Sequence, residues 1–96
     1  MEQNQTPQQL QIKARDEEMK GVYSNLMQIV HTKEEFVFDF FLNAPPQGIL
    51  ASRVIISPGH AKRIAAALAE NVKKYEEKFG PITGSELPEE KIGFVK

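Results

Sequence analysis

The chain has 96 residues, a formal net charge of −1 and no cysteine. This length fits a single domain, because domains typically contain between about 50 and 250 residues. The charge balance gives no global basic excess of the kind that favours nucleic-acid binding, and the lack of cysteine excludes disulfides and thiol chemistry. No apolar run approaches the roughly 18 residues of a membrane span, and the first nine residues lack the features of a signal peptide. We therefore expect a cytoplasmic protein with no membrane partner.

The sequence predicts one ordered region between two tails. Residues 1–8 are polar and rich in glutamine, so they have too little apolar mass to fold and predict a disordered tail. Residues 82–96 contain scattered apolar side chains without a period and predict a mobile tail. Residues 9–81 then make up the single domain.

Alternating or β-branched apolar residues indicate the strands of an antiparallel sheet. The charged residues 16–21 predict a connection, with or without a helical turn. Residues 32–33 or 32–34 predict the tip of a hairpin, and the stretch NAPPQG at residues 43–48 predicts a loop. Strand patterns lie between these segments, at residues 10–15, 22–31, 36–42 and 49–56.

Residues 57–81 predict one long helix. Ser57 is a suitable N-cap and Pro58 fits the first helical position, while Gly80 and Pro81 provide a stop signal. One apolar stripe repeats at steps of three and four residues: Ala61, Ile64, Ala65, Leu68, Val72, Tyr75 and Phe79. The expected fold is α+β, with a three- to four-stranded antiparallel sheet followed by one long helix packed on one face.

The two strands at residues 22–31 and 36–42 carry apolar side chains on both faces, and one helix covers only one face. Exposed apolar patches usually mark a partner, and most oligomers are symmetric homo-oligomers. We expect a homodimer formed by the free face or edge of the sheet; the alternative is a monomer with a partly apolar sheet surface. The expected interaction residues are Tyr23, Asn25, Val37, Asp39, Phe41 and Arg53.

Asp39 and Arg53 are charged residues in the middle of apolar strands. One interpretation is a cross-strand salt bridge that fixes the register of the sheet. The other is that Arg53 binds a phosphate or a carboxylate of a partner.

No pattern predicts catalysis, a cofactor or a metal site. His31 and His60 are the only histidines, and no carboxylate accompanies them at metal-ligand spacing. Ser57 is explained by helix capping, and no serine lies in the strand–turn–helix elbow of hydrolases. No glycine-rich phosphate loop is present. We therefore expect no enzyme.

Several short motifs, spread over about residues 9–81, together resemble one known family. They are Tyr23-Ser24-Asn25, Glu35-Phe36, Asp39-Phe40, Ser52-Arg53-Val54-Ile55, Ser57-Pro58, His60-Ala61-Lys62-Arg63, Glu70-Asn71, Tyr75-Glu76 and Phe79-Gly80. The combination is similar to a small bacterial and archaeal family catalogued as domain of unknown function 3467. The resemblance supplies no activity, cofactor or catalytic residue. Some members of the family lie beside genes of the transcription machinery, which implies a macromolecular partner.

Two functions follow from these observations. The first is a non-enzymatic interaction module, a homodimeric accessory subunit of a larger, transcription-related assembly. The alternative is a dimeric protein that binds single-stranded nucleic acid, because the order of four strands and a helix is similar to one PUR repeat. In that case Arg53, Lys62 and Arg63 would contact the nucleic acid, and exposed aromatic side chains would stack on bases.

Overall fold

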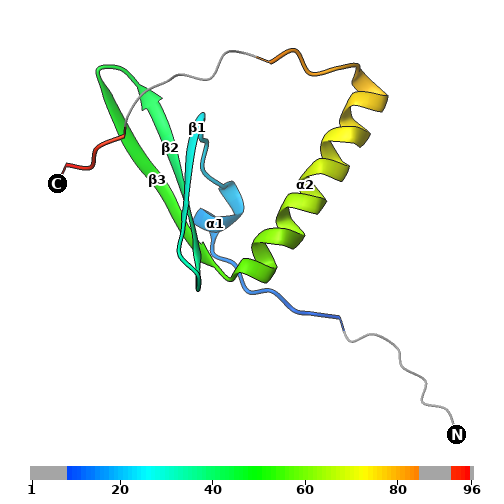
Figure 1. The fold of residues 1–96 in the computed structure, drawn as a ribbon, viewed down its shortest axis with the longest axis horizontal. Helices are drawn as coiled ribbons and strands as arrows, with labels where there is room; N and C mark the ends of the chain where they lie inside the picture. Colours follow the sequence, from blue (N-terminus) through cyan, green and yellow to red (C-terminus); the bar gives the residue numbers. More distant parts are fainter. Residues whose placement is uncertain (1–8, 85–91, 96) are drawn as a thin grey trace, which may run out of the picture. The chain divides into compact units, whose positions relative to one another are not determined.

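The computed structural model describes residues 9–84 and 92–95 (Figure 1). The elements are, in chain order, α1 (Asp16–Lys20), β1 (Leu26–His31), β2 (Phe36–Ala44), β3 (Gln47–Ile56) and α2 (Pro58–Phe79). They divide into a sheet unit, Met1–Pro58, and a helix unit, Gly59–Lys96. The tail expected at residues 1–8 lies outside the described residues, as do residues 85–91 and 96 of the tail expected at the other end.

The three strands form one antiparallel sheet, in which β2 lies between β1 and β3 (Figure 1). The predicted arrangement of an antiparallel sheet followed by one long helix is therefore confirmed. The additional strand expected at residues 10–15 is not formed: this segment has no regular structure, and Leu10 is 79% exposed. A few alternating apolar side chains stabilise a strand only when a neighbouring strand and a core cover them, and this segment has neither.

The turn between β1 and β2 lies where the sequence places it. The backbone amide of Thr32 donates a hydrogen bond of 2.9 Å to the carbonyl of Glu35. The Thr32 hydroxyl in turn accepts hydrogen bonds from the amides of Glu34 and Glu35, at 3.1 and 3.2 Å. Threonine therefore holds the hairpin tip by local side-chain bonds to the backbone, which is a recurrent role of this residue type in turns.

The turn between β2 and β3 is shorter than expected. The sequence predicts a loop over residues 43–48, but the ladder continues into this stretch, where Asn43 pairs with Gly48 and Ala44 with Gln47. Only the two prolines, residues 45–46, remain as the turn. The expectation was wrong because both prolines lie at the tip, where they remove no hydrogen bond from the ladder.

Helix α2 begins and ends at the predicted residues. Gly80 follows it with a φ of 94°, a left-handed conformation that glycine adopts readily, and its amide donates to the carbonyl of Glu76 at 2.9 Å. The side-chain carboxylate of Glu76 also accepts a hydrogen bond, from the backbone amide of Ile82 at 2.9 Å. These contacts close the C-terminal end of the helix.

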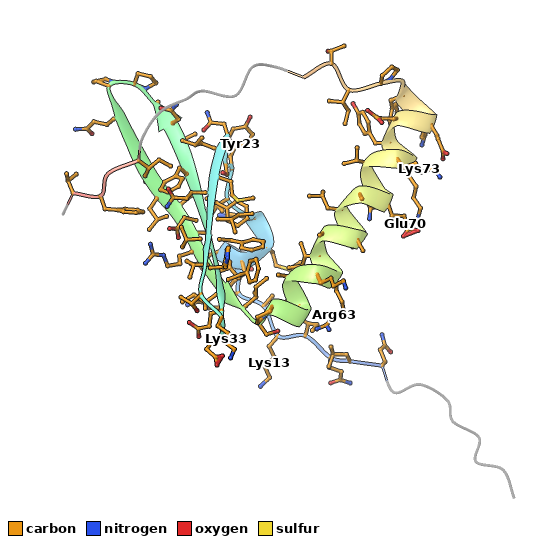
Figure 2. The ribbon with its side chains drawn as sticks, viewed as in Figure 1. Lys13, Tyr23, Lys33, Arg63, Glu70 and Lys73 are labelled. Carbon is orange, nitrogen blue, oxygen red and sulfur yellow. The ribbon has the colours of Figure 1, made fainter. Side chains whose placement is uncertain are left out.

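Polar and apolar side chains separate along α2. Arg63, Glu70 and Lys73 point to the same side of the helix (Figure 2). Nζ of Lys74 lies 3.9 Å from Oε1 of Glu70 in an i,i+4 pair. No residue of α2 is buried, and Leu68 in the apolar stripe is 60% exposed. Packing of this stripe against a face of the sheet stays a prediction.

Phe41 is the one apolar side chain that is buried among the described residues, at 6% exposure. We expect Phe41→Ala to lower the free energy of unfolding by about 3 kcal/mol, because it removes an aromatic side chain from a packed position. Urea unfolding followed by circular dichroism measures this change. Ile49→Ala is the control, since Ile49 is 61% exposed. Equal losses in the two variants would contradict a core centred on Phe41.

Candidate interaction surface

The strand register sorts the side chains of the sheet onto two faces, because residues directly opposite each other on antiparallel strands project to the same side. The first, which we call the Phe38 face, carries Met27, Ile29, His31, Phe36, Phe38, Phe40, Leu42, Ile49, Ser52, Val54 and Ile56. The second, the Asp39 face, carries Leu26, Gln28, Val30, Val37, Asp39, Phe41, Leu50, Arg53 and Ile55.

A β-bulge in β3 places Leu50 and Arg53 on the same face. The register shifts between Phe40 and Phe41, and Ala51 is the extra residue on β3. In a regular strand, residues three positions apart project to opposite faces. The bulge therefore brings Leu50 opposite the buried Phe41. The bulge, and with it the role of Leu50, was not predicted from the sequence. The small residues that interrupt the apolar pattern of β3 are the signal that indicates it.

Asp39 and Arg53 form the polar centre of the Asp39 face. They lie opposite each other in the ladder, where Nε of Arg53 donates to Oδ1 of Asp39 at 2.6 Å and an Nη donates to Oδ2 at 2.8 Å. Asp39 is 1% exposed, whereas the Arg53 side chain is 48% exposed. The cross-strand salt bridge predicted from the sequence is thereby confirmed. Its two-pronged geometry is the strong form of an arginine–carboxylate contact.

The contact changes the acidity of both groups. The hydrogen bonds from Arg53 hold the pKa of Asp39 below its ordinary value of 3.8, even though burial acts in the opposite direction, and the positive charge lowers it further. The hydrogen bonds to Asp39, with the attraction of its charge, raise the pKa of Arg53. Both groups therefore remain charged across the neutral range.

Gln28, Asp39 and Arg53 lie at one level of the sheet and make a polar row across its three strands. Apolar side chains lie on both sides of this row, and three of those at the margin are about half exposed: Val30, Leu50 and Ile55. The Asp39 face thus combines a buried polar centre with an accessible apolar margin. Gln28 and Ile55 were not predicted as interaction residues, because their membership of this face depends on the register.

The six expected interaction residues do not all share this face. Asn25 precedes β1, and its side-chain amide donates to the carbonyl of Asn43 at 3.1 Å and accepts from the amide of Asn43 at 2.7 Å. It therefore extends the β1–β2 ladder. Tyr23 is 76% exposed and lies at the opposite end of β1 from Lys33 (Figure 2). The structure brings together the other four: Val37, Asp39, Phe41 and Arg53.

The three residues expected to contact nucleic acid belong to different units. Arg53 is in β3 of the sheet unit, whereas Lys62 and Arg63 are exposed in the first turns of α2. In addition, Arg53 is engaged by a buried carboxylate.

The described residues contain no group of three or more histidine, aspartate or glutamate side chains that could hold a metal ion. His31 stacks on Phe36 with ring centroids 5.1 Å apart, and His60 lies in the first turn of α2. Within the part of the chain that the structure describes, no helix is long and apolar enough to cross a membrane.

A family model described as "Protein of unknown function (DUF3467)" matches residues 1–84. The chain belongs to this family. The match confirms the resemblance seen in the sequence and extends it, because it includes the first eight residues, which precede the motifs that carry the resemblance. No curated protein and no solved structure matches the chain.

The lowered pKa of Asp39 predicts how stability depends on pH. The folded state binds the Asp39 proton less readily than the unfolded state, so the pair stabilises the fold above pH 3.8 and loses this contribution as the pH falls from 3.8 through the lower pKa of the folded state. We expect Asp39→Asn to be less stable at neutral pH but to lose less stability on acidification. Urea midpoints measured from neutral pH to below pH 3.8 test this; parallel acid limbs for the two proteins would contradict it.

Proposed function

We propose that this DUF3467 protein is a non-enzymatic interaction module that works as a homodimeric accessory subunit of a larger, transcription-related assembly. The observation that carries the proposal is the apolar surface exposed on both sheet faces and along α2 in the described residues. Monomeric soluble proteins rarely leave large contiguous apolar patches in water. The transcription-related part rests on the gene neighbourhood of family members alone.

The surface proposed for the partner is the Asp39 face. It joins the ion pair of Asp39 and Arg53 to an apolar margin in which Val30, Leu50 and Ile55 are about half exposed. The half-exposed Arg53 supports this assignment, since arginine is enriched in protein interfaces.

Light scattering coupled to size exclusion tests the homodimer. We expect a mass of twice 10.8 kDa at high protein concentration. A mass of 10.8 kDa over the whole accessible concentration range would contradict self-association.

The partner surface is tested by affinity purification from the native cell with three versions of the chain. We expect Val30→Glu, which puts a charge on the apolar margin of the Asp39 face, to lose the partner that the wild type retains. Ala66→Glu is the control, because its spacing from Arg63 and Lys73 places it on the polar side of α2. Retention of the same partner by both variants would contradict the assignment of the Asp39 face.

Binding of single-stranded nucleic acid remains the alternative. Its support is weaker than the sequence suggests, because Arg53 is neutralised by Asp39 and the strand that would complete the PUR-like order is not formed. We expect fluorescence anisotropy with labelled DNA and RNA oligomers to show no binding at low salt. Salt-dependent binding, weakened by Lys62→Ala or Arg63→Ala but not by Lys33→Ala, would favour the alternative.

A further inference from the structure

Strand β3 lies at an edge of the sheet and is its longest strand. It has ten residues and pairs with β2 along one side, and no strand formed by residues 9–84 or 92–95 lies on its other side (Figure 1). An edge of this kind is a template for pairing with another chain. The opposite edge, β1, has only six residues, and short edge strands are one of the means by which proteins prevent such pairing.

The usual protections are largely missing from β3. It contains no lysine and no proline, and its one charged side chain, Arg53, is bonded to Asp39 within the same sheet. The bulge at Ala51 disrupts only the half of β3 that is nearer the turn between β2 and β3. The other half, Ser52–Ile56, pairs residue for residue with β2 and is regular. The accessible template is therefore this second half.

We propose that Ser52–Ile56 is the seam between two copies of the chain. The two β3 strands pair antiparallel about a two-fold axis at Val54, and two three-stranded sheets become one sheet of six strands. This inference rests on the proposed homodimer and names the surface that forms it.

The register follows from the side chains. A two-fold axis perpendicular to the sheet keeps each face on its own side, so residues of the Asp39 face must pair with residues of the Asp39 face. Centring the seam on Arg53 would put two guanidinium groups opposite each other, which is destabilising. Centring it on Ile55 would extend the pairing toward Pro58, which has no amide to donate. The centre at Val54 avoids both problems.

At this centre the strand segment complements itself. Val54 faces Val54 of the partner subunit, and Arg53 faces Ile55 of the partner subunit, which is a pair without like charges. β-branched side chains suit such cross-strand positions. Val54 is 43% exposed and Ile55 is 54% exposed, so both still have surface to bury. Because the paired segment is short compared with a standard interface, we expect the dimer to dissociate on dilution.

The absence of cysteine allows a direct test by disulfide trapping. A cysteine at the axis meets its own copy at cross-strand distance, which is close to the separation that a disulfide needs. We expect full-length Val54→Cys to form a covalent dimer under mild oxidation, at least ten times faster than the control Ile49→Cys. Ile49 lies on the same strand and the same face but is more exposed, at 61%. Random collisions would therefore favour the control.

A second pair of variants does not depend on the packing of Val54. Ser52 faces Ile56 of the partner subunit in the proposed register, so a mixture of Ser52→Cys and Ile56→Cys chains should cross-link faster than either variant alone. Circular dichroism shows whether each variant is folded.

The outcomes separate this inference from the proposed homodimer. Selective trapping at Val54, or in the mixture, supports the seam. If light scattering shows a dimer while the cross-linking rates of the variants follow only the exposure of the substituted side chains, the seam is overturned but the homodimer stays in place. A chain that stays monomeric overturns both.

Discussion

The ion pair between Asp39 and Arg53 is the contact on which both faces of the sheet depend. A slip of one residue between β2 and β3 would send every side chain of β3 to the opposite face. It would also leave the buried carboxylate of Asp39 without its cationic partner, and an unpaired buried charge is strongly destabilising. Backbone hydrogen bonds form equally well in neighbouring registers, so this two-pronged contact distinguishes the correct alignment from the others. Its main contribution is therefore to specificity.

The bulge at Ala51 and the ion pair together determine which side chains of β3 lie on the Asp39 face. With Arg53 fixed opposite Asp39, a regular β3 would place Ala51 opposite Phe41 and turn Leu50 to the other face. The extra residue instead puts the larger Leu50 opposite Phe41, the buried aromatic side chain of the sheet unit. The Asp39 face thereby gains apolar area beside its core residue. The same irregularity divides β3 into a distorted half and a regular half, which differ in their capacity to pair with another strand.

The features that the sequence predicted best are those marked by the type of a single residue or of a pair of residues. The limits of α2 follow from local signals such as Pro58 and Gly80, and the Asp39–Arg53 pair follows from two opposite charges in the middle of apolar strands. The bulge is harder to predict, because the insertion of one residue leaves composition almost unchanged and its only local signal is the small residues that interrupt the apolar pattern of β3. The prediction of a strand at residues 10–15 was wrong for a related reason. Alternation shows which side chains could be covered, but not whether a strand edge is available beside them.

The ion pair also explains why an edge strand of this length remains open to association. A lone arginine on an edge strand normally disfavours pairing with another chain, because its charge resists burial against a second strand. Here both prongs of the Arg53 guanidinium are directed across the ladder to Asp39 on the central strand, so its charge is compensated within the sheet. The ion pair that fixes the register thus compensates the one charge on β3 that would oppose pairing with another strand. Self-association at this edge would leave the Asp39 faces of two copies side by side, as one larger surface for a common partner.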